Sequence, residues 1–118
     1  MAKLNRIVRE IVDATVAAVE PERIVLFGSR ARGDERPGSD LDLLVVAGAP
    51  FTAAHSRQEA LRRIRRALGG VRIPVDILLY TPAEVDAWRD SRNHVIGRSL
   101  REGVTAYERP QACVIETA

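Results

Sequence analysis

The sequence is poor in several residue types, and each scarcity narrows what the protein can be. It contains one cysteine, Cys113, so no disulfide can form within the chain, and we expect a reducing, cytoplasmic setting. No stretch approaches the roughly 18 apolar residues that a membrane-spanning helix needs. Residues 1–13 mix charged with apolar side chains, so we do not expect them to act as a targeting signal. These features argue against a disulfide scaffold and a membrane protein.

Lysine is also nearly absent, because Lys3 is the only one and the other basic residues are arginines. This bias reflects either coding preference or the suitability of arginine for phosphate and interfaces. The formal net charge of +2 is too small to indicate nucleic-acid binding. The 118 residues are 46% apolar and 29% charged, as expected of one globular domain. We expect that domain over residues 1–108, followed by a poorly ordered tail over 109–118.

Hydrophobic periodicity and turn residues predict alternating helices and strands. Apolar residues at helical spacing, with proline and glycine as terminators, predict the helices, and short β-branched runs predict the strands. We expect helices over residues 3–19, 52–68, 81–90 and 91–102, strands over 23–27, 40–46 and 72–80, and an extended segment over 104–107. A single helical turn is expected over 29–33 and a turn over 34–38. This order predicts an α/β (α+β) fold with one small sheet covered by helices.

Two aspartates, Asp40 and Asp42, are two positions apart on the strand predicted over 40–46. Strand side chains alternate between faces, so the two carboxylates are expected on one face. Adjacent carboxylates repel each other, and hard divalent cations such as Mg²⁺ relieve that repulsion. Two such ions can clamp the attacking and leaving oxygens of a displacement at phosphorus. The alternative is an ordinary solvated strand face.

Gly28 and Ser29 lie between a predicted strand and a predicted helical turn. Glycine permits close backbone approach, and the first amides of a helical turn are unpaired and suit an anion. The Ser29 hydroxyl can add a hydrogen bond to a phosphate. The alternative is a simple strand-to-helix turn capped by Ser29.

A third carboxylate, Asp76, interrupts the apolar strand predicted over 72–80. Such a carboxylate is costly unless it is paired, liganded or at an exposed edge. If this strand lies beside the one over 40–46, Asp76 can join Asp40 and Asp42. There it would complete a metal site or deprotonate an attacking hydroxyl. Together, the phosphate cradle and three acids indicate phosphoryl-transfer chemistry.

The glycine-serine pair, ten intervening residues and the Asp40-x-Asp42 pair resemble the signature of the DNA polymerase β-like nucleotidyltransferase superfamily. The stretch GSRARGDERPGSDLDLLVV is similar to its minimal branch, the MNT domains found as antitoxins beside HEPN toxins. The segment over residues 100–107 also resembles the way such domains end. This resemblance implies the superfamily's palm fold, with a single small mixed sheet.

The resemblance also implies an activity, a set of site residues and a partner. Gly28 and Ser29 would bind the triphosphate of ATP, and Arg30 and Arg32 in the same loop would contact phosphates or form surface ion pairs. Asp40, Asp42 and Asp76 would hold Mg²⁺, with two ions expected. The implied reaction is AMP transfer to a hydroxyl, with a tyrosine of a HEPN ribonuclease toxin as the expected acceptor.

Two other readings remain open for the same residues. The chain can be a non-catalytic antitoxin that blocks its toxin by contact, or a small-molecule nucleotidyltransferase of the aminoglycoside type. A second chain is expected to supply the acceptor, while direct nucleic-acid or membrane binding is not expected.

The remaining polar and aromatic residues give weaker signals. Several arginines gather on the helix predicted over 52–68, as a solvated face or as a patch for an acidic partner or RNA: Arg57, Arg62, Arg63, Arg65 and Arg66. Trp88 is expected to anchor packing. His55 and His94 are isolated, so the sequence offers no Cys/His metal spacing.

Overall fold

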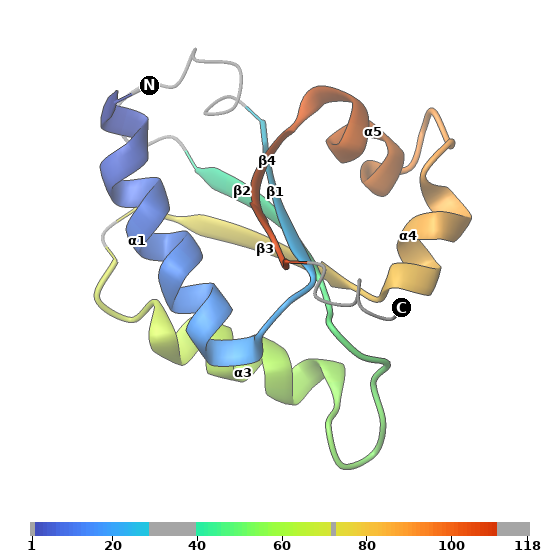
Figure 1. The fold of residues 1–118 in the computed structure, drawn as a ribbon, viewed down its shortest axis with the longest axis horizontal. Helices are drawn as coiled ribbons and strands as arrows, with labels where there is room; N and C mark the ends of the chain where they lie inside the picture. Colours follow the sequence, from blue (N-terminus) through green and yellow to red (C-terminus); the bar gives the residue numbers. More distant parts are fainter. Residues whose placement is uncertain (1, 29–39, 72, 111–118) are drawn as a thin grey trace, which may run out of the picture.

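A four-stranded sheet with helices on both faces forms the centre of the molecule (Figure 1). The structure is a computed structural model that describes residues 2–28, 40–71 and 73–110. Its helices are α1 (Ala2–Val19), α3 (Arg57–Ala67), α4 (Pro82–Trp88) and α5 (Val95–Glu102). Its strands are β1 (Arg23–Phe27), β2 (Leu41–Val46), β3 (Val75–Tyr80) and β4 (Val104–Glu108). The predicted α/β class and single mixed sheet are confirmed.

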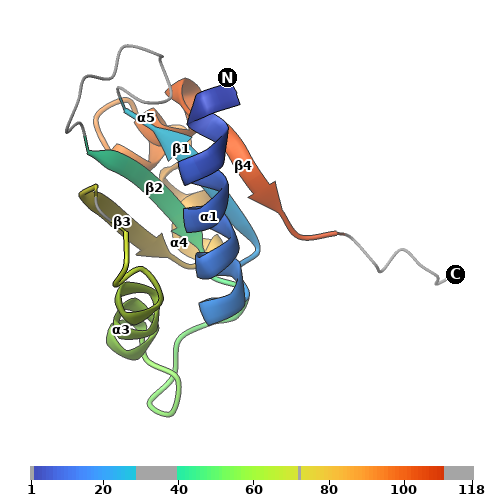
Figure 2. The same cartoon turned by 90° about the vertical axis from the view of Figure 1, so that its left-hand side faces the viewer.

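The strand order is β3-β2-β1-β4, as the view in Figure 2 displays. β1 pairs antiparallel with both β2 and β4, whereas β2 and β3 are parallel. Parallel neighbours need a crossover connection, and α3 supplies it between β2 and β3. The mixed character of the sheet therefore follows from this one crossover.

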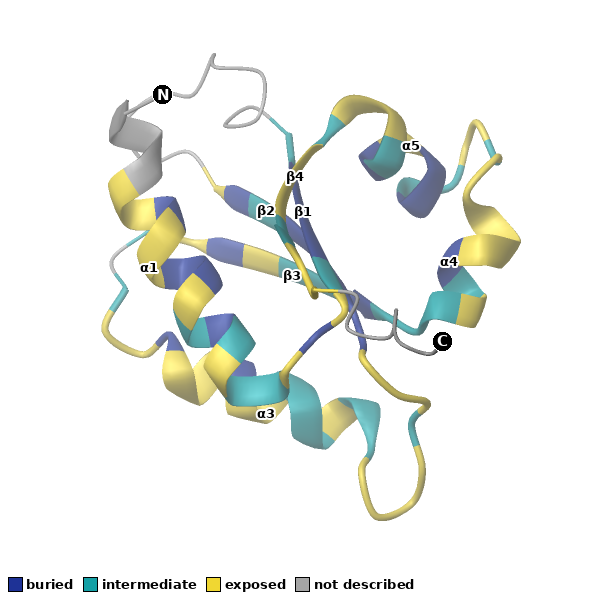
Figure 3. Cartoon of the chain, in the orientation of Figure 1, coloured by how far each residue is buried: buried dark blue, intermediate teal, exposed yellow. Residues whose placement is uncertain are grey.

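The two faces of the sheet carry separate apolar cores. The larger core lies under α1 and α3 and includes the fully buried Ile11, Leu43 and Ile64. The smaller lies under α4 and α5 and includes Leu44 and Ile96. Because both faces are covered, the middle of β2 is buried on both sides (Figure 3). The central strands are therefore rigid supports for whatever projects from their ends.

Three elements begin three or more residues later than the sequence predicted. α3 begins at Arg57 rather than near Thr52, because Ser56 adopts extended backbone angles and its hydroxyl accepts a hydrogen bond from the Glu59 amide. α5 begins at Val95, where the His94 imidazole accepts from the Ile96 amide. β3 begins at Val75, immediately after Pro74.

Other expectations are met closely. β1 has the predicted bounds, α1 ends at Val19 before Pro21, and Thr81 forms the predicted capping box with Glu84 at the start of α4. The expected turns over 29–38, and Cys113 with most of the tail, lie outside the described residues. Across the segments that are described, no helix is both long and apolar enough to cross a membrane.

Candidate functional site

Asp42 and Asp76 are directly opposite each other on the parallel strands β2 and β3. Neighbouring strands lie about 4.8 Å apart, so the two carboxylates project side by side. Both share a face with residues of the smaller core, because Leu44 and Leu78 lie two positions further along each strand. Asp42 is partly buried and Asp76 is exposed. The structure thus brings together two of the three predicted acids.

Asp40 lies one residue before β2 and is exposed. The amide of the next residue, Leu41, donates a 2.9 Å hydrogen bond to the carbonyl of Pro74, which ties the starts of β2 and β3 together. This bond keeps Asp40 at the same end of the sheet as Asp42 and Asp76. Asp40 therefore lies at the same end of the sheet as the other two acids, although it lies just outside the strand that was predicted to contain it.

Gly28 directly follows β1 at this same end of the sheet. Its neighbour Phe27, the last residue of β1, lies opposite Asp42 in the antiparallel pair. Gly28 has a φ of 83°, a left-handed conformation that favours glycine. A Cβ atom built at this position would lie 3.2 Å from Cγ of Asp42 and would collide with its Oδ2 oxygen. The absence of a side chain at Gly28 therefore leaves room for the Asp42 carboxylate.

Two carboxylates directly opposite on neighbouring strands repel each other. Such a pair is a suitable donor set for a hard cation, whose other ligands can be water and substrate phosphates. Over the part of the chain that the structure describes, no three His, Cys, Asp or Glu side chains are gathered closely enough to hold a metal by themselves. The pair fits a divalent metal ion whose remaining ligands come from water or a bound substrate.

The predicted phosphate loop comprises Gly28, Ser29, Arg30 and Arg32. Ser29, Arg30 and Arg32 lie outside the described residues, so their roles stay predictions. What the structure adds is the position of Gly28, which puts the start of that loop beside Asp42.

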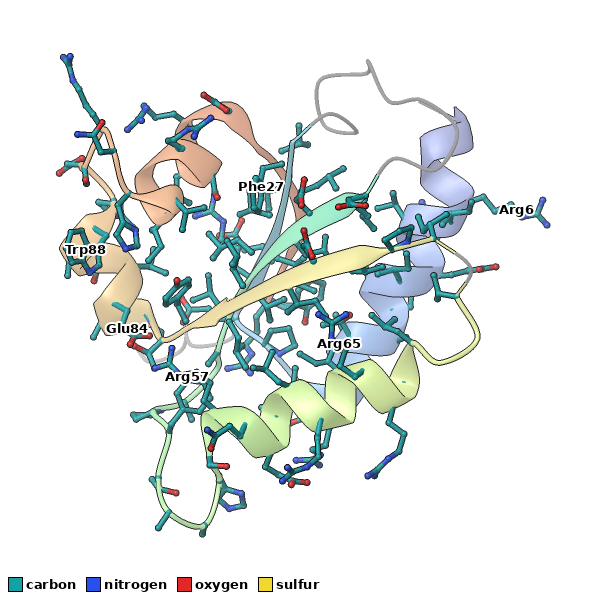
Figure 4. All side chains as sticks on the ribbon, turned by 180° about the vertical axis from the view of Figure 1, so that it is seen from behind. Arg6, Phe27, Arg57, Arg65, Glu84 and Trp88 are labelled. Atoms are coloured by element: carbon teal, nitrogen blue, oxygen red, sulfur yellow. The ribbon has the colours of Figure 1, made fainter. Side chains whose placement is uncertain are left out.

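Two arginines of the predicted α3 cluster are structural. Arg57 donates to the Leu79 carbonyl at 3.1 Å and pairs with Glu84 at 2.8 Å, which joins α3 to β3 and α4 (Figure 4). The pKa of Glu84 is lowered by the hydrogen bond from Arg57, and then by the hydrogen bond from the Thr81 amide. Arg65 donates to the Val75 carbonyl at 2.7 Å.

The rest of the cluster resembles a solvated helix face. Arg62 pairs with Glu59 at 2.6 Å, and hydrogen bonding by Arg62 lowers the Glu59 pKa. Arg63 and Arg66 are exposed. No sequence pattern separates Arg57 and Arg65 from these neighbours, since only the packing of α3 against β3 distinguishes them.

Trp88 differs from the expected packing anchor, because it is 46% exposed. Its ring stacks on that of His94, with centroids 4.2 Å apart and planes inclined by 19°. His94, which appeared isolated in the sequence, therefore both caps α5 and supports Trp88.

A family model for the nucleotidyltransferase domain matches residues 2–101 of this sequence. The chain belongs to this family. The match contains β1, β2 and β3 in full, and with them Gly28, Asp42 and Asp76. Its members are transferases of nucleotidyl groups, and as a family they use nucleoside triphosphates with a divalent metal.

Solved structures share the fold. A candidate nucleotidyltransferase from Sulfolobus solfataricus is 25% identical, with a TM-score of 0.58 over 92% of this chain and 83% of that one. A toxin–antitoxin structure with AMP-PNP is 21% identical, with a TM-score of 0.55 over 87% of this chain and 74% of that one. A mutant MntA–HpeT toxin–antitoxin is 18% identical, with a TM-score of 0.52 over the same shares. No curated protein matches the sequence. The nucleotidyltransferase fold is thus shared with proteins of toxin–antitoxin systems.

Proposed function

We propose that this nucleotidyltransferase moves AMP from ATP to a hydroxyl group of a partner toxin, with Mg²⁺ held by Asp40, Asp42 and Asp76. The observation that carries the proposal is the pairing of Asp42 with Asp76 beside Gly28. The family match supports nucleotidyl transfer in general.

Two structures of similar fold support the donor and the partner. One is a toxin–antitoxin with AMP-PNP, an ATP analogue. The other carries two Asp-to-Glu substitutions, two positions apart like Asp40 and Asp42 here. The proposed partner is a HEPN-type toxin, and the proposed acceptor is a tyrosine hydroxyl near its active site.

In the proposed reaction, the residues at this end of the sheet have separate roles. The triphosphate would lie beside Gly28, whose missing side chain leaves room for the Asp42 carboxylate at the same end of the sheet. Asp40, Asp42 and Asp76 would hold the ions, which supply charge neutralisation for the triphosphate when bound. Asp76, which is exposed, orients the acceptor hydroxyl and accepts its proton.

The hydroxyl oxygen forms a bond to the α-phosphorus while the bond from that phosphorus to the bridging oxygen breaks. Pyrophosphate leaves with the electron pair, and the proton passes to the Asp76 carboxylate. The product is an AMP phosphodiester on the toxin.

The test is transfer of label from ATP radiolabelled at the α-phosphate to a co-purified toxin partner, followed by intact-mass measurement. Asp42→Asn is expected to lower the rate at least ~100-fold, as loss of one electrostatic contact to the reacting centre commonly does. Asp90→Asn, on the exposed turn after α4, is the matched control and should transfer normally.

Transfer that survives Asp40→Ala together with Asp42→Ala would overturn the assignment. A double variant that transfers no label but still neutralises an equimolar toxin would instead favour inhibition by contact. Label found on an aminoglycoside and not on a protein would favour a small-molecule enzyme.

A further inference from the structure

The two edge strands of the sheet, β3 and β4, differ in what covers them. The outer side of β3 is covered by side chains of α3. Arg57 and Arg65 of α3 donate to the carbonyls of Leu79 and Val75. Arg57 and Arg65 are eight residues apart on the helix, a rise of about 12 Å. Val75 and Leu79 are four residues apart on the strand, a distance of about 13 Å. The spacing of the two arginines therefore equals the spacing of the two carbonyls. Figure 4 shows both side chains on α3 beside β3. These bonds occupy main-chain acceptors that another strand would need.

The β4 edge has no such cover in the described segments. Most of β4 is exposed (Figure 3), with Tyr107 the exception among its five residues. Val104 retains 54% of its accessible surface. β4 carries no lysine or proline, two residue types that commonly protect an edge strand, and its one charged residue is Glu108 at its end. An open edge of this kind is a template for another strand.

A groove of about 370 Å³ follows this open edge between β4 and α1. Val8 and Val12 of α1 line it on one side, and Val104, Ala106 and Tyr107 of β4 on the other. A β-bulge interrupts the ladder between β4 and β1 at Ile24 and Val25, so strand pairing alone would be short. Apolar contacts in the groove would add to it.

The charges on α1 indicate which partner fits. Its exposed stripe beside the groove is basic in the first half, with Arg6 and Arg9, and acidic further on, with Asp13 and then Glu20 after the helix. Arg9 and Asp13 both line the groove. An antiparallel copy of the same helix would place the basic half of each against the acidic half of the other.

We propose that two copies of this chain associate through α1 and β4 into a two-fold symmetric dimer with one continuous sheet. A two-fold axis perpendicular to the sheet makes β4 antiparallel to its symmetry copy and keeps both α1 helices on one face. α1 and β4 run in the same sense in the views of Figures 1 and 2, so the two α1 helices are antiparallel as well. Arg9 of each copy then faces Asp13 of the other.

This dimer leaves the end of the sheet that carries Asp42 and Asp76 open in both copies. These residues lie at the start of β2 and β3, and the two-fold axis places the two copies of this site at opposite ends of the joined sheet. The dimer thus presents two independent sites, and its formation does not depend on the proposed reaction.

The test measures the mass of the full chain in solution by light scattering and sedimentation. The wild type is expected at twice the mass of one chain at micromolar concentrations. Arg9→Asp and Asp13→Arg should each weaken association about tenfold, equal to about 1.4 kcal/mol. The double variant should recover the wild-type dissociation constant, because the two charges exchange places.

A second pair of variants tests the strand. Ala106→Lys places two positive charges near the axis and should give a monomer, whereas Ala83→Lys, at an exposed position of α4, should remain dimeric. Circular dichroism on each variant checks that it is folded. A monomeric wild type, or single variants that the double variant fails to rescue, would overturn the proposal. So would a monomer whose β4 amides gain hydrogen-exchange protection only with another protein, which would assign this face to that protein.

Discussion

Gly28 is the residue on which the geometry of the candidate site depends most directly. It combines a left-handed backbone with a position against the Asp42 carboxylate. A methyl group there must displace either the turn or the carboxylate, so the effect on the site is expected to exceed the effect on folding.

We predict that Gly28→Ala lowers the free energy of unfolding by about 1–3 kcal/mol, since the left-handed conformation is strained for alanine. We expect transfer activity to fall by a larger factor, because Asp42 is displaced. Thermal unfolding and a transfer assay on the same sample give the two values. Gly70→Ala is the control, because a Cβ at Gly70 meets no atom within 4 Å. Equal activity for both variants would contradict the role of Gly28.

Asp76 illustrates a conflict between stability and function. It lies opposite another carboxylate, an arrangement that destabilises neighbouring strands. We predict that Asp76→Asn, measured by denaturant unfolding without metal, is as stable as the wild type or more stable by up to ~1 kcal/mol. Its transfer activity should be lost. A variant that is clearly destabilised would show that Asp76 has a structural role instead.

At the scale of elements, the sequence predicted most of the architecture because the signals are local. Apolar spacing and Pro21 define α1, and Thr81 with Glu84 defines the start of α4. The start of α3 differs from the prediction, although Ser56 and Glu59 show the same Ser/Thr-x-x-Glu spacing as Thr81 and Glu84. The start of α5 was misplaced because a histidine cap is not a common sequence signal.

The candidate site was predictable only in part, for a physical reason. Strand alternation relates Asp40 to Asp42, because both belong to one short segment. The pairing of Asp42 with Asp76 depends on a parallel crossover, which no local pattern encodes. The contact between Gly28 and Asp42 likewise arises from strand pairing between separate segments.

Arg57 connects three elements, and its removal should have a pH signature. We predict that Arg57→Leu lowers the free energy of unfolding at neutral pH by about 1–2 kcal/mol, reduced by the partial exposure of the ion pair. The pKa of Glu84 is held below its ordinary value of 4.5 by Arg57, so this stabilisation is present above pH 4.5. It is lost as the pH falls through the lowered pKa.

The difference in stability between wild type and Arg57→Leu should therefore narrow in acid. Urea unfolding at a series of pH values measures it. Arg62→Leu is the control, since the Arg62–Glu59 pair is largely exposed and should matter little. A gap that stays constant into strong acid would show that the Leu79 carbonyl contact, and not Glu84, accounts for the effect.

For the molecule as a whole, ligand binding should be visible as stability. Asp42 and Asp76 lie on strands separated in sequence by α3, so a nucleotide–magnesium complex bound there favours the folded chain over the unfolded one. We predict that ATP with Mg²⁺ at ten times its dissociation constant adds about 1.4 kcal/mol to the free energy of unfolding.

This gain should raise Tm by roughly 5 °C or more for a domain of this size. Differential scanning calorimetry measures the change, and ATP with a chelator in place of magnesium is the control. The same increase in Asp42→Asn would place the nucleotide elsewhere on the molecule.

The parallel pairing of β2 with β3 also determines when the candidate site can form during synthesis of the chain. Asp40 and Asp42 leave the ribosome before α3, but the strand that carries Asp76 cannot dock until α3 has crossed over. A nascent chain that stops before Val75 therefore has two acids and no counterpart for them. The protein has no partial version of this site, and any activity should appear only after the crossover is complete.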